Sequence, residues 1–210
     1  MSEIKTIVFD LDNTLYAKES GLLSEVNRRI QVFITKNFNL SEEDAIKLRR
    51  RLFEQYGTTL SGLMAEKNVD AEKYLEFVHN INANEFLKRN EELIRLLEGI
   101  KQKKIIFTNS PMSHVLKVLN VLGIERFFSD IIDIHSLDFI PKPSEEAFKK
   151  LFKGKIKPKE SMIIDDYEHN LKPAKKFGMT TVLVGNDNCD KPYIDYYINK
   201  ITDIEKILRK

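Results

Sequence analysis

The chain has 210 residues, of which 42% are hydrophobic and 31% charged, a composition typical of a folded globular protein rather than a disordered one. Its 34 basic residues are nearly balanced by 32 acidic ones, which argues against a dedicated nucleic-acid binder. The single cysteine, Cys189, excludes an intramolecular disulfide, and no apolar run approaches the roughly 20 residues of a membrane span. We therefore expect a cytoplasmic protein of one domain, or of one domain with a sizeable insertion, that binds neither nucleic acid nor a membrane.

The first predicted strand, Thr6–Phe9, leads straight into Asp10-Leu11-Asp12-Asn13-Thr14. In open α/β sheets, ligands bind beyond the carboxyl ends of the strands. Asp10 and Asp12 are two residues apart in extended chain, so their side chains point to the same side. Carboxylates that close repel each other and need a cation or a bound proton. The alternative is that these residues only begin a turn, as Asp and Asn often do.

Residues 21–97 show no convincing strand and only amphipathic helical patterns. The predicted helices are Leu22–Asn37, Ser41–Tyr56, Ala71–His79 and Glu91–Leu97. The stretch YGTTLSGLM, residues 56–64, interrupts the helical pattern with two glycines and two threonines. Because this crossover is far longer than usual, we favour an inserted helical cap over a helical layer packed on the sheet. We place the cap domain at 19–97 and the α/β core domain at 1–18 and 98–210.

The second predicted strand, Lys104–Phe107, ends in Thr108-Asn109-Ser110, and a predicted helix follows at Met112–Leu122. Hydroxyl, amide and backbone N–H groups at a strand end can donate to phosphate oxygens. The same residues also serve as helix caps, which is the alternative interpretation here.

After the third predicted strand, Ile131–Ile134, Lys142 lies between two prolines, and a helix is predicted to follow Ser144. The prolines restrict the backbone on both sides of the lysine, which would hold its ammonium group in place. A lysine exposed to solvent is the alternative.

The fourth predicted strand, Met162–Ile164, runs into a second acidic pair, Asp165 and Asp166, where a helix over His169–Phe177 is expected to begin. An N-cap pair is the alternative for these two acids. The chain closes with two predicted strands and a helix, at Thr181–Val184, Tyr196–Ile198 and Ile201–Leu208.

This alternation of strands and helices predicts an α/β fold, with a Rossmann-like open parallel sheet flanked by helices. Each of the four polar motifs follows a different strand, so all four converge on one rim of the sheet. Four carboxylates at one spot require a metal ion, and hard oxygen ligands favour Mg²⁺. One divalent ion and one lysine leave one negative charge on the site, so we expect one protonated Asp, which would serve as a general acid.

These motifs, in this order, resemble the four motifs of the haloacid dehalogenase (HAD) superfamily of phosphohydrolases. The resemblance covers the whole chain, with residues from about 20 to 90 matching the inserted helical cap. The stretches FDLDNTLY and YGTTLSGLM are similar to the branch of pyrimidine 5'-nucleotidases. The resemblance implies a Mg²⁺-dependent phosphomonoesterase that hydrolyses pyrimidine nucleoside 5'-monophosphates, UMP or CMP, to nucleoside and phosphate.

The resemblance also implies catalytic roles. Asp10 would be the nucleophile that forms an aspartyl-phosphate, and Asp12 would protonate the leaving oxygen and then activate water. Thr108 and the backbone amide of Asn109 would bind phosphoryl oxygens, while Lys142 would neutralise the nucleophile and the transferring group.

For the metal, the resemblance implies Asp10, the backbone carbonyl of Asp12 and one or both of the late acids as Mg²⁺ ligands. Of these we prefer Asp166 as the direct ligand, with Asp165 acting directly or through water.

Four further residues are candidates for substrate contacts. Tyr16 and Tyr56 could stack on a base, and Thr58 and Thr59 could hydrogen-bond a pyrimidine edge. Packing is the commoner use of such aromatic residues, and caps or turns are the commoner use of such threonines.

Two other functions fit part of the pattern. A HAD phosphatase for another small metabolite, such as a sugar phosphate, fits the same motifs because the cap supplies specificity. A response-regulator receiver domain also gathers acids, a Thr and a Lys around Mg²⁺, but it places its adjacent acidic pair first and lacks the helical insertion. We therefore expect a small phosphorylated metabolite as the partner of a monomer or weak homodimer.

Overall fold

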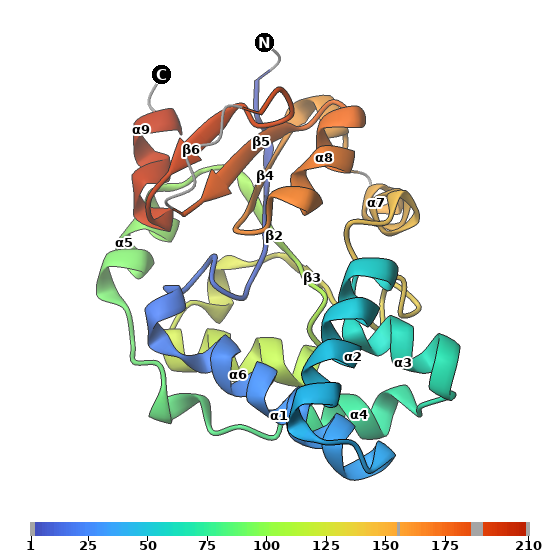
Figure 1. Cartoon of the computed structure of the whole chain (residues 1–210). Helices are drawn as coiled ribbons and strands as arrows, with labels where there is room; N and C mark the ends of the chain where they lie inside the picture. Colours follow the sequence, from blue (N-terminus) through green and yellow to red (C-terminus); the bar gives the residue numbers. More distant parts are fainter. Residues whose placement is uncertain (1–2, 155, 186–190, 209–210) are drawn as a thin grey trace.

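The computed structural model describes residues 3–154, 156–185 and 191–208, so Cys189 lies outside the described residues. The described residues contain a sheet of six parallel strands in the order β3-β2-β1-β4-β5-β6 (Figure 1). The strands are β1 (Thr6–Phe9), β2 (Lys103–Phe107), β3 (Asp130–Ile132), β4 (Ser161–Asp165), β5 (Thr180–Val184) and β6 (Tyr196–Ile198). The predicted open parallel sheet flanked by helices is confirmed.

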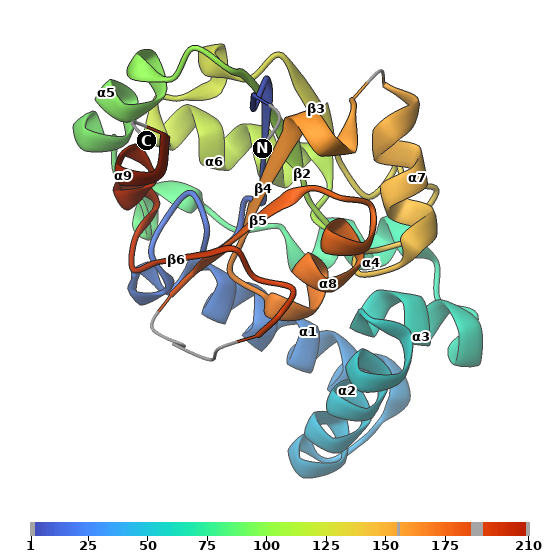
Figure 2. The same ribbon diagram turned by 90° about the horizontal axis from the view of Figure 1, so that it is seen from above.

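Helices cover both faces of the sheet because the strands are apolar on both sides. Successive residues of β1 alternate between two hydrophobic clusters: Ile7 and Phe9 belong to one, and Val8 belongs to the other. The first cluster includes side chains of α5 (Glu91–Gly99), α6 (Met112–Leu122) and α9 (Glu205–Leu208), and the second includes side chains of α7 (Glu145–Lys153) and α8 (Glu168–Lys176). Figure 2 shows these two layers on opposite sides of the strands.

Strand order brings three of the polar motifs to neighbouring strand ends. β1 lies between β2 and β4, and Phe9 is level with Ile106 on one side and Ile164 on the other. The ladder continues one residue further, where Asp10 N donates to Ile164 O at 2.9 Å. The segments that follow these three strands therefore start at one edge of the sheet.

The third strand ends two residues earlier than the sequence predicts. At Asp133 the buried carboxylate accepts from the backbone N–H groups of Met112 and Ser136, at 2.9 and 3.0 Å. This side chain stabilises a turn in which Ile134 N donates to Ser110 O. The turn replaces the last part of the expected strand. Its hydrogen bonds connect the residues after β3 to the segment after β2.

Four helices between β1 and β2 form a cluster of their own. They are α1 (Leu22–Phe38), α2 (Glu42–Tyr56), α3 (Thr59–Lys67) and α4 (Ala71–Val78). Their buried side chains, among them Ile34, Leu52 and Leu63, pack together, and Figure 1 shows these inserted helices beyond the carboxyl ends of the strands. The apolar side chains of α5 instead join the cluster of the sheet. Within the described ranges, no helix has the length and apolar character needed to cross a membrane.

The stretch 56–64, which the sequence pattern marks as an interruption, contains a helix boundary followed by a helix. Gly57 ends α2 with a left-handed backbone, φ +81°, and Thr58 caps α3 by accepting from Ser61 N at 3.1 Å. Gly62 lies where α3 approaches α2, because a Cβ there would come within 2.7 Å of Leu52 Cβ. This glycine permits close packing inside a helix, so the expected break is limited to two residues.

Candidate active site

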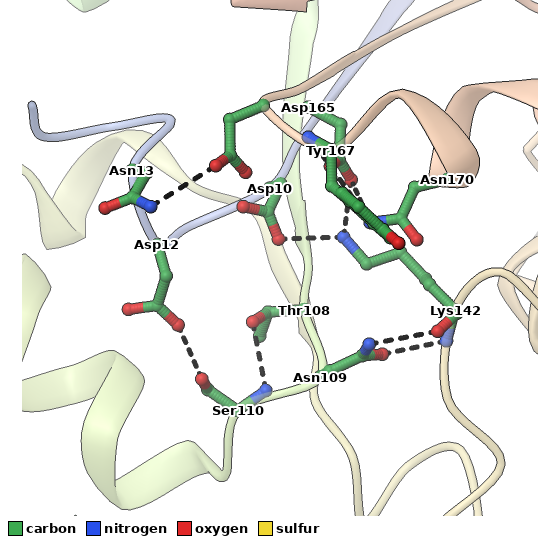
Figure 3. A network of polar contacts seen from close by, with 11 residues as sticks. Asp10, Asp12, Asn13, Thr108, Asn109, Ser110, Lys142, Asp165, Tyr167 and Asn170 are labelled. Carbon is green, nitrogen blue, oxygen red and sulfur yellow. Dashed lines mark hydrogen bonds and ion pairs between the residues drawn. The ribbon is translucent and has the colours of Figure 1, made fainter. Parts of the chain in front are cut away.

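The centre of the site is a buried lysine between two carboxylates. Lys142 Nζ donates to Asp10 Oδ1 at 2.7 Å and to Asp165 Oδ2 at 2.8 Å, and Figure 3 shows the three side chains converging from separate segments. Lys142 is only 1% exposed. Burial alone would lower its pKa, but Asp10 and Asp165 outweigh burial, so the pKa is raised and the ammonium stays charged.

Asn109 fixes the loop that carries this lysine. Its side-chain Oδ1 accepts from Lys142 N at 2.8 Å, and its Nδ2 donates to Lys142 O at 3.1 Å. The segment after β2 is thereby joined to the loop between Pro141 and Pro143. Both polar atoms of the Asn109 side chain take part in this contact, and its backbone amide is available for a phosphate.

Three carboxylates form a cluster that could hold a metal ion. Asp10, Asp165 and Asp166 each offer one oxygen, and these oxygens lie within 4.8 Å of one another. Burial, followed by the charge of Asp165, raises the pKa of Asp166 to about 7. Burial and the neighbouring acids also raise the pKa of Asp10, although Lys142 opposes them.

The two adjacent acids have different surroundings. Asp165 is fully buried and accepts from Lys142 Nζ, from Tyr167 N at 2.9 Å and from Asn170 Nδ2 at 2.9 and 3.0 Å. Among the residues that the structure describes, Asp166 has one hydrogen bond, a longer one, from Asn13 Nδ2 at 3.3 Å. Protein donors therefore occupy the carboxylate of Asp165, whereas that of Asp166 retains free lone pairs.

Asp12 points away from this cluster, toward the segment after β2. Its Oδ1 accepts from Tyr16 OH at 2.6 Å and lies 2.8 Å from His114 Nε2, and its Oδ2 accepts from Ser110 Oγ at 2.6 Å. Figure 3 shows the Asp12 carboxylate directed at Ser110. Burial opposes ionisation, but His114 and the other two donors hold the pKa of Asp12 well below its ordinary value. Asp12 is thus ionised here, and the carboxyls whose pKa values are raised are Asp10 and Asp166.

A cavity of about 530 Å³ extends from these acids to the inserted helices. Thr108, which is 1% exposed and accepts from Ser110 N at 3.1 Å, lines its inner end. Thr58 and Thr59 also line it, the first as the cap of α3. Most of the remaining wall is apolar and comes from α1, α2 and α4, through residues such as Leu23, Val26, Ile30, Phe53 and Val78.

The two tyrosines proposed for base stacking are used elsewhere. Tyr16 is 5% exposed and its hydroxyl is bonded to Asp12. Tyr56 packs among the inserted helices and is hydrogen-bonded to Glu66. Neither tyrosine lines the cavity, so a flat substrate would not stack on them in this arrangement.

The sequence pattern indicated Ser110 as a phosphate donor or helix cap, but it did not indicate that Ser110, His114 and Asn170 hold the acids. Ser110 lies just before α6 and His114 lies in its first turn, and both side chains reach Asp12. Both residues follow β2 in the sequence, but nothing local in the sequence indicates that they contact Asp12. Asn170, in the first turn of α8, reaches back five residues to Asp165. Its signal in the sequence was weak, because Asn near a helix start usually indicates a cap.

Comparison with known proteins agrees with this fold. Residues 4–178 match the family described as haloacid dehalogenase-like hydrolase. Phosphate metabolism protein 8 of Saccharomyces cerevisiae is 29% identical over 195 residues, covering 85% of this chain and 61% of the yeast protein. Glyceraldehyde 3-phosphate phosphatase of Methanocaldococcus jannaschii is 27% identical and covers 99% of both chains. The crystal structure of the HAD-hydrolase YfnB of Bacillus subtilis superposes with a TM-score of 0.66 at 19% identity, covering all of both chains.

The fold and the family match define a hydrolase, and the predicted class of enzyme, a phosphatase, is confirmed. The chain belongs to the haloacid dehalogenase-like hydrolases.

Proposed function

We propose that this chain is a Mg²⁺-dependent phosphomonoesterase that forms an aspartyl-phosphate on Asp10, with pyrimidine nucleoside 5'-monophosphates as its substrates. The observation that carries the proposal is the contact of Lys142 Nζ with Asp10 Oδ1 at 2.7 Å, at the inner end of a cavity large enough for a small metabolite. A buried cation beside a nucleophilic carboxylate is suited to receive the negative phosphoryl group.

The donor set fits a divalent cation. Asp10, Asp165 and Asp166 offer hard carboxylate oxygens close together, and in the described residues Asn13 Oδ1 is buried without a hydrogen-bond partner. Among the acids, the free lone pairs of Asp166 favour it as a direct ligand, next to Asp10. A bound Mg²⁺ would neutralise charge on the phosphoryl oxygens. The crystal structure of YfnB is described as bound to magnesium, which supports the same choice of ion.

Several residues would contribute to the first step, the transfer of the phosphoryl group to Asp10. Asp10 attacks phosphorus in line, a new bond forms from its carboxylate oxygen, and the bond from phosphorus to the leaving oxygen breaks. Lys142 stays between Asp10 and Asp165 and offsets charge on the nucleophile and the transferring group. Thr108 Oγ1 accepts from Ser110 N, which leaves its hydroxyl proton free to donate to a phosphoryl oxygen.

Asp12 would donate a proton in the first step and accept one in the second. As an ionised carboxylate it is ready to take a proton from the water that hydrolyses the aspartyl-phosphate. For the first step it needs a proton to give to the leaving oxygen. A phosphate monoester, whose second pKa is about 6, can bring that proton in when it binds as the monoanion.

The inserted helices would select the leaving group. We propose that residues 19–97 act as a cap domain on a core of 1–18 and 98–210, with the cavity between the two. Within this range α1 to α4 would form the cap proper, because the side chains of α5 pack in the cluster of the sheet. Glyceraldehyde 3-phosphate phosphatase matches the whole chain, so a small sugar-type phosphate is the second candidate substrate. The cytoplasmic setting and a monomeric or weakly dimeric state remain predictions from the sequence.

The test is phosphate release from a panel of UMP, CMP, AMP and glyceraldehyde 3-phosphate, with Mg²⁺ and with a chelator. We expect release only with Mg²⁺ and fastest from UMP or CMP. Asp10→Asn should lower the rate by at least about a thousand-fold while circular dichroism stays unchanged. Equal rates on purine and pyrimidine nucleotides would remove the substrate assignment, and full activity of Asp10→Asn would remove the mechanism.

A further inference from the structure

Three consecutive arginines on α2 have different partners. Arg50 Nε lies 2.8 Å from Glu54 Oε1, and Arg51 Nη1 lies 2.6 Å from Glu66 Oε1. Arg49 instead donates from Nη2 to the side-chain oxygen of Asn27 at 2.6 Å. Across residues 3–154, 156–185 and 191–208, no carboxylate forms an ion pair with Arg49.

Arg49 also differs in its burial: Arg50 and Arg51 are exposed, and Arg50, which lines the same cavity, is paired with Glu54. Arg49 is half-buried, and both it and Asn27 line the cavity that contains Asp10 and Asp12. Ile30 and Ile46 are among the apolar residues that line the same cavity, and burial lowers the pKa of the Arg49 guanidinium. A guanidinium has five N–H donors, and a half-buried one without a counter-ion is costly unless a ligand completes its hydrogen bonds.

We propose that Arg49 binds an acceptor oxygen, carbonyl or anionic, on the leaving group of the substrate, and that Asn27 orients the guanidinium for this contact. The inference rests on the proposed function and narrows its substrates to phosphomonoesters with such an oxygen away from the transferred phosphate. A ring carbonyl of a pyrimidine nucleotide meets this requirement, and so does the carboxylate of a phosphorylated hydroxy acid. The apolar walls pack against the body of the leaving group between these two ends.

The test compares two matched pairs of substrates. UMP and ribose 5-phosphate differ by the base with its carbonyls, and 3-phosphoglycerate and glycerol 3-phosphate differ by a carboxylate. UMP and 3-phosphoglycerate are the members that carry the acceptor oxygen. In at least one pair the wild type should show the higher kcat/KM for this member, and that pair identifies the source of the oxygen. In Arg49→Met the ratio of kcat/KM within that pair should fall by roughly ten- to 100-fold, the range for a hydrogen bond to a charged group.

Two further variants separate recognition from structure. Arg51→Met, from the neighbouring surface ion pair, should leave the ratio unchanged. Asn27→Asp keeps the guanidinium but gives it a carboxylate partner inside the protein, so it should reduce the ratio as Arg49→Met does. An unchanged ratio in Arg49→Met, or a wild type with no preference in either pair, overturns the proposal.

Binding provides a readout that does not depend on hydrolysis. Calorimetry with Asp10→Asn should show tighter binding of the acceptor-bearing member, and adding Arg49→Met should remove the difference. If the wild type releases no phosphate from any of the four compounds, the proposed function fails. The binding comparison still decides the role of Arg49, because equal affinities before and after Arg49→Met contradict it.

Discussion

At the scale of single residues, the site depends on a cation that the protein has removed from water. Lys142 is 1% exposed and touches two carboxylates, of which Asp165 is also held by Asn170. Burying an ion is costly, and the cost is offset only while its partners remain. Removing the lysine would leave two buried carboxylates next to each other and to Asp166.

This arrangement predicts a stability effect that depends on pH. Lys142→Met, measured by urea unfolding with a chelator present, should lower the free energy of unfolding by about 3–5 kcal/mol at pH 7. The pKa of Asp10 is already raised in the folded state and rises further without the lysine. A carboxyl with a raised pKa takes up protons more readily when folded, so acid stabilises the variant, and its deficit should shrink at pH 5.

A control for this measurement is Lys47→Met, which removes an exposed lysine paired with Glu43 and should change stability by less than about 1 kcal/mol at either pH. A deficit of Lys142→Met that is equal at pH 7 and pH 5 would contradict the account.

The sequence indicated the reactive residues but not their surroundings. Asp10 and Lys142 could be predicted because strand ends and flanking prolines leave local signals. The ionised state of Asp12 could not, because Ser110 and His114 are about a hundred residues away along the chain. Which donors surround a carboxylate, and hence its pKa, is decided by tertiary packing.

At the scale of elements, the inserted helices depend on close packing of α2 and α3. The sequence pattern predicted an interruption over residues 56–64, because its two glycines and two threonines have low helix propensity. The structure uses Gly62 inside α3, where Leu52 and Tyr56 of α2 leave no room for a side chain. Helix propensity depends on local sequence, whereas the need for a glycine at position 62 comes from the neighbouring helix α2. The helix α3 could therefore not be predicted from its own residues.

Two alanine substitutions test this packing. Gly62→Ala should destabilise the protein by about 1–3 kcal/mol, because its Cβ would lie 2.7 Å from Leu52 Cβ and Cδ2. Gly99→Ala, at the end of α5, meets nothing within 4 Å and should stabilise by about 0.5–1 kcal/mol through helix propensity. Thermal unfolding of both variants measures the contrast. A stabilising Gly62→Ala would show that the two helices are not in close contact.

At the scale of the whole molecule, the order of the strands brings the residues of the site next to one another. The sequence predicted the parallel sheet from its apolar strands, but it did not predict that β1 lies between β2 and β4, since strand pairing is a long-range property. That order brings Asp10, Thr108 and Asp165 to adjacent strand ends. The loop with Lys142 joins them through Asn109.

Three carboxylates at the ends of β1 and β4, those of Asp10, Asp165 and Asp166, could hold a metal ion. Because a bound ion would join the two strands, we expect Mg²⁺ to stabilise the whole fold. At a Mg²⁺ concentration about 100 times its dissociation constant, binding contributes roughly 2.7 kcal/mol, and Tm should rise by roughly 5–10 °C. Asp166→Asn should lose most of this rise, whereas Asp130→Asn, at the exposed start of β3, should keep it. If the Tm of the wild type does not change when Mg²⁺ is added, the metal assignment is contradicted.

The most direct test of the central claim is to trap the phosphorylated enzyme. Protein mixed with substrate and Mg²⁺ is quenched and treated with borohydride, which reduces an acyl phosphate to an alcohol, and the peptides are sequenced by mass spectrometry. Homoserine should replace aspartate at position 10, and it should be absent when a chelator replaces Mg²⁺ or when Asp10→Asn is used. Homoserine at another position, or steady hydrolysis of substrate with an intact Asp10 and no trapped product, would contradict the account.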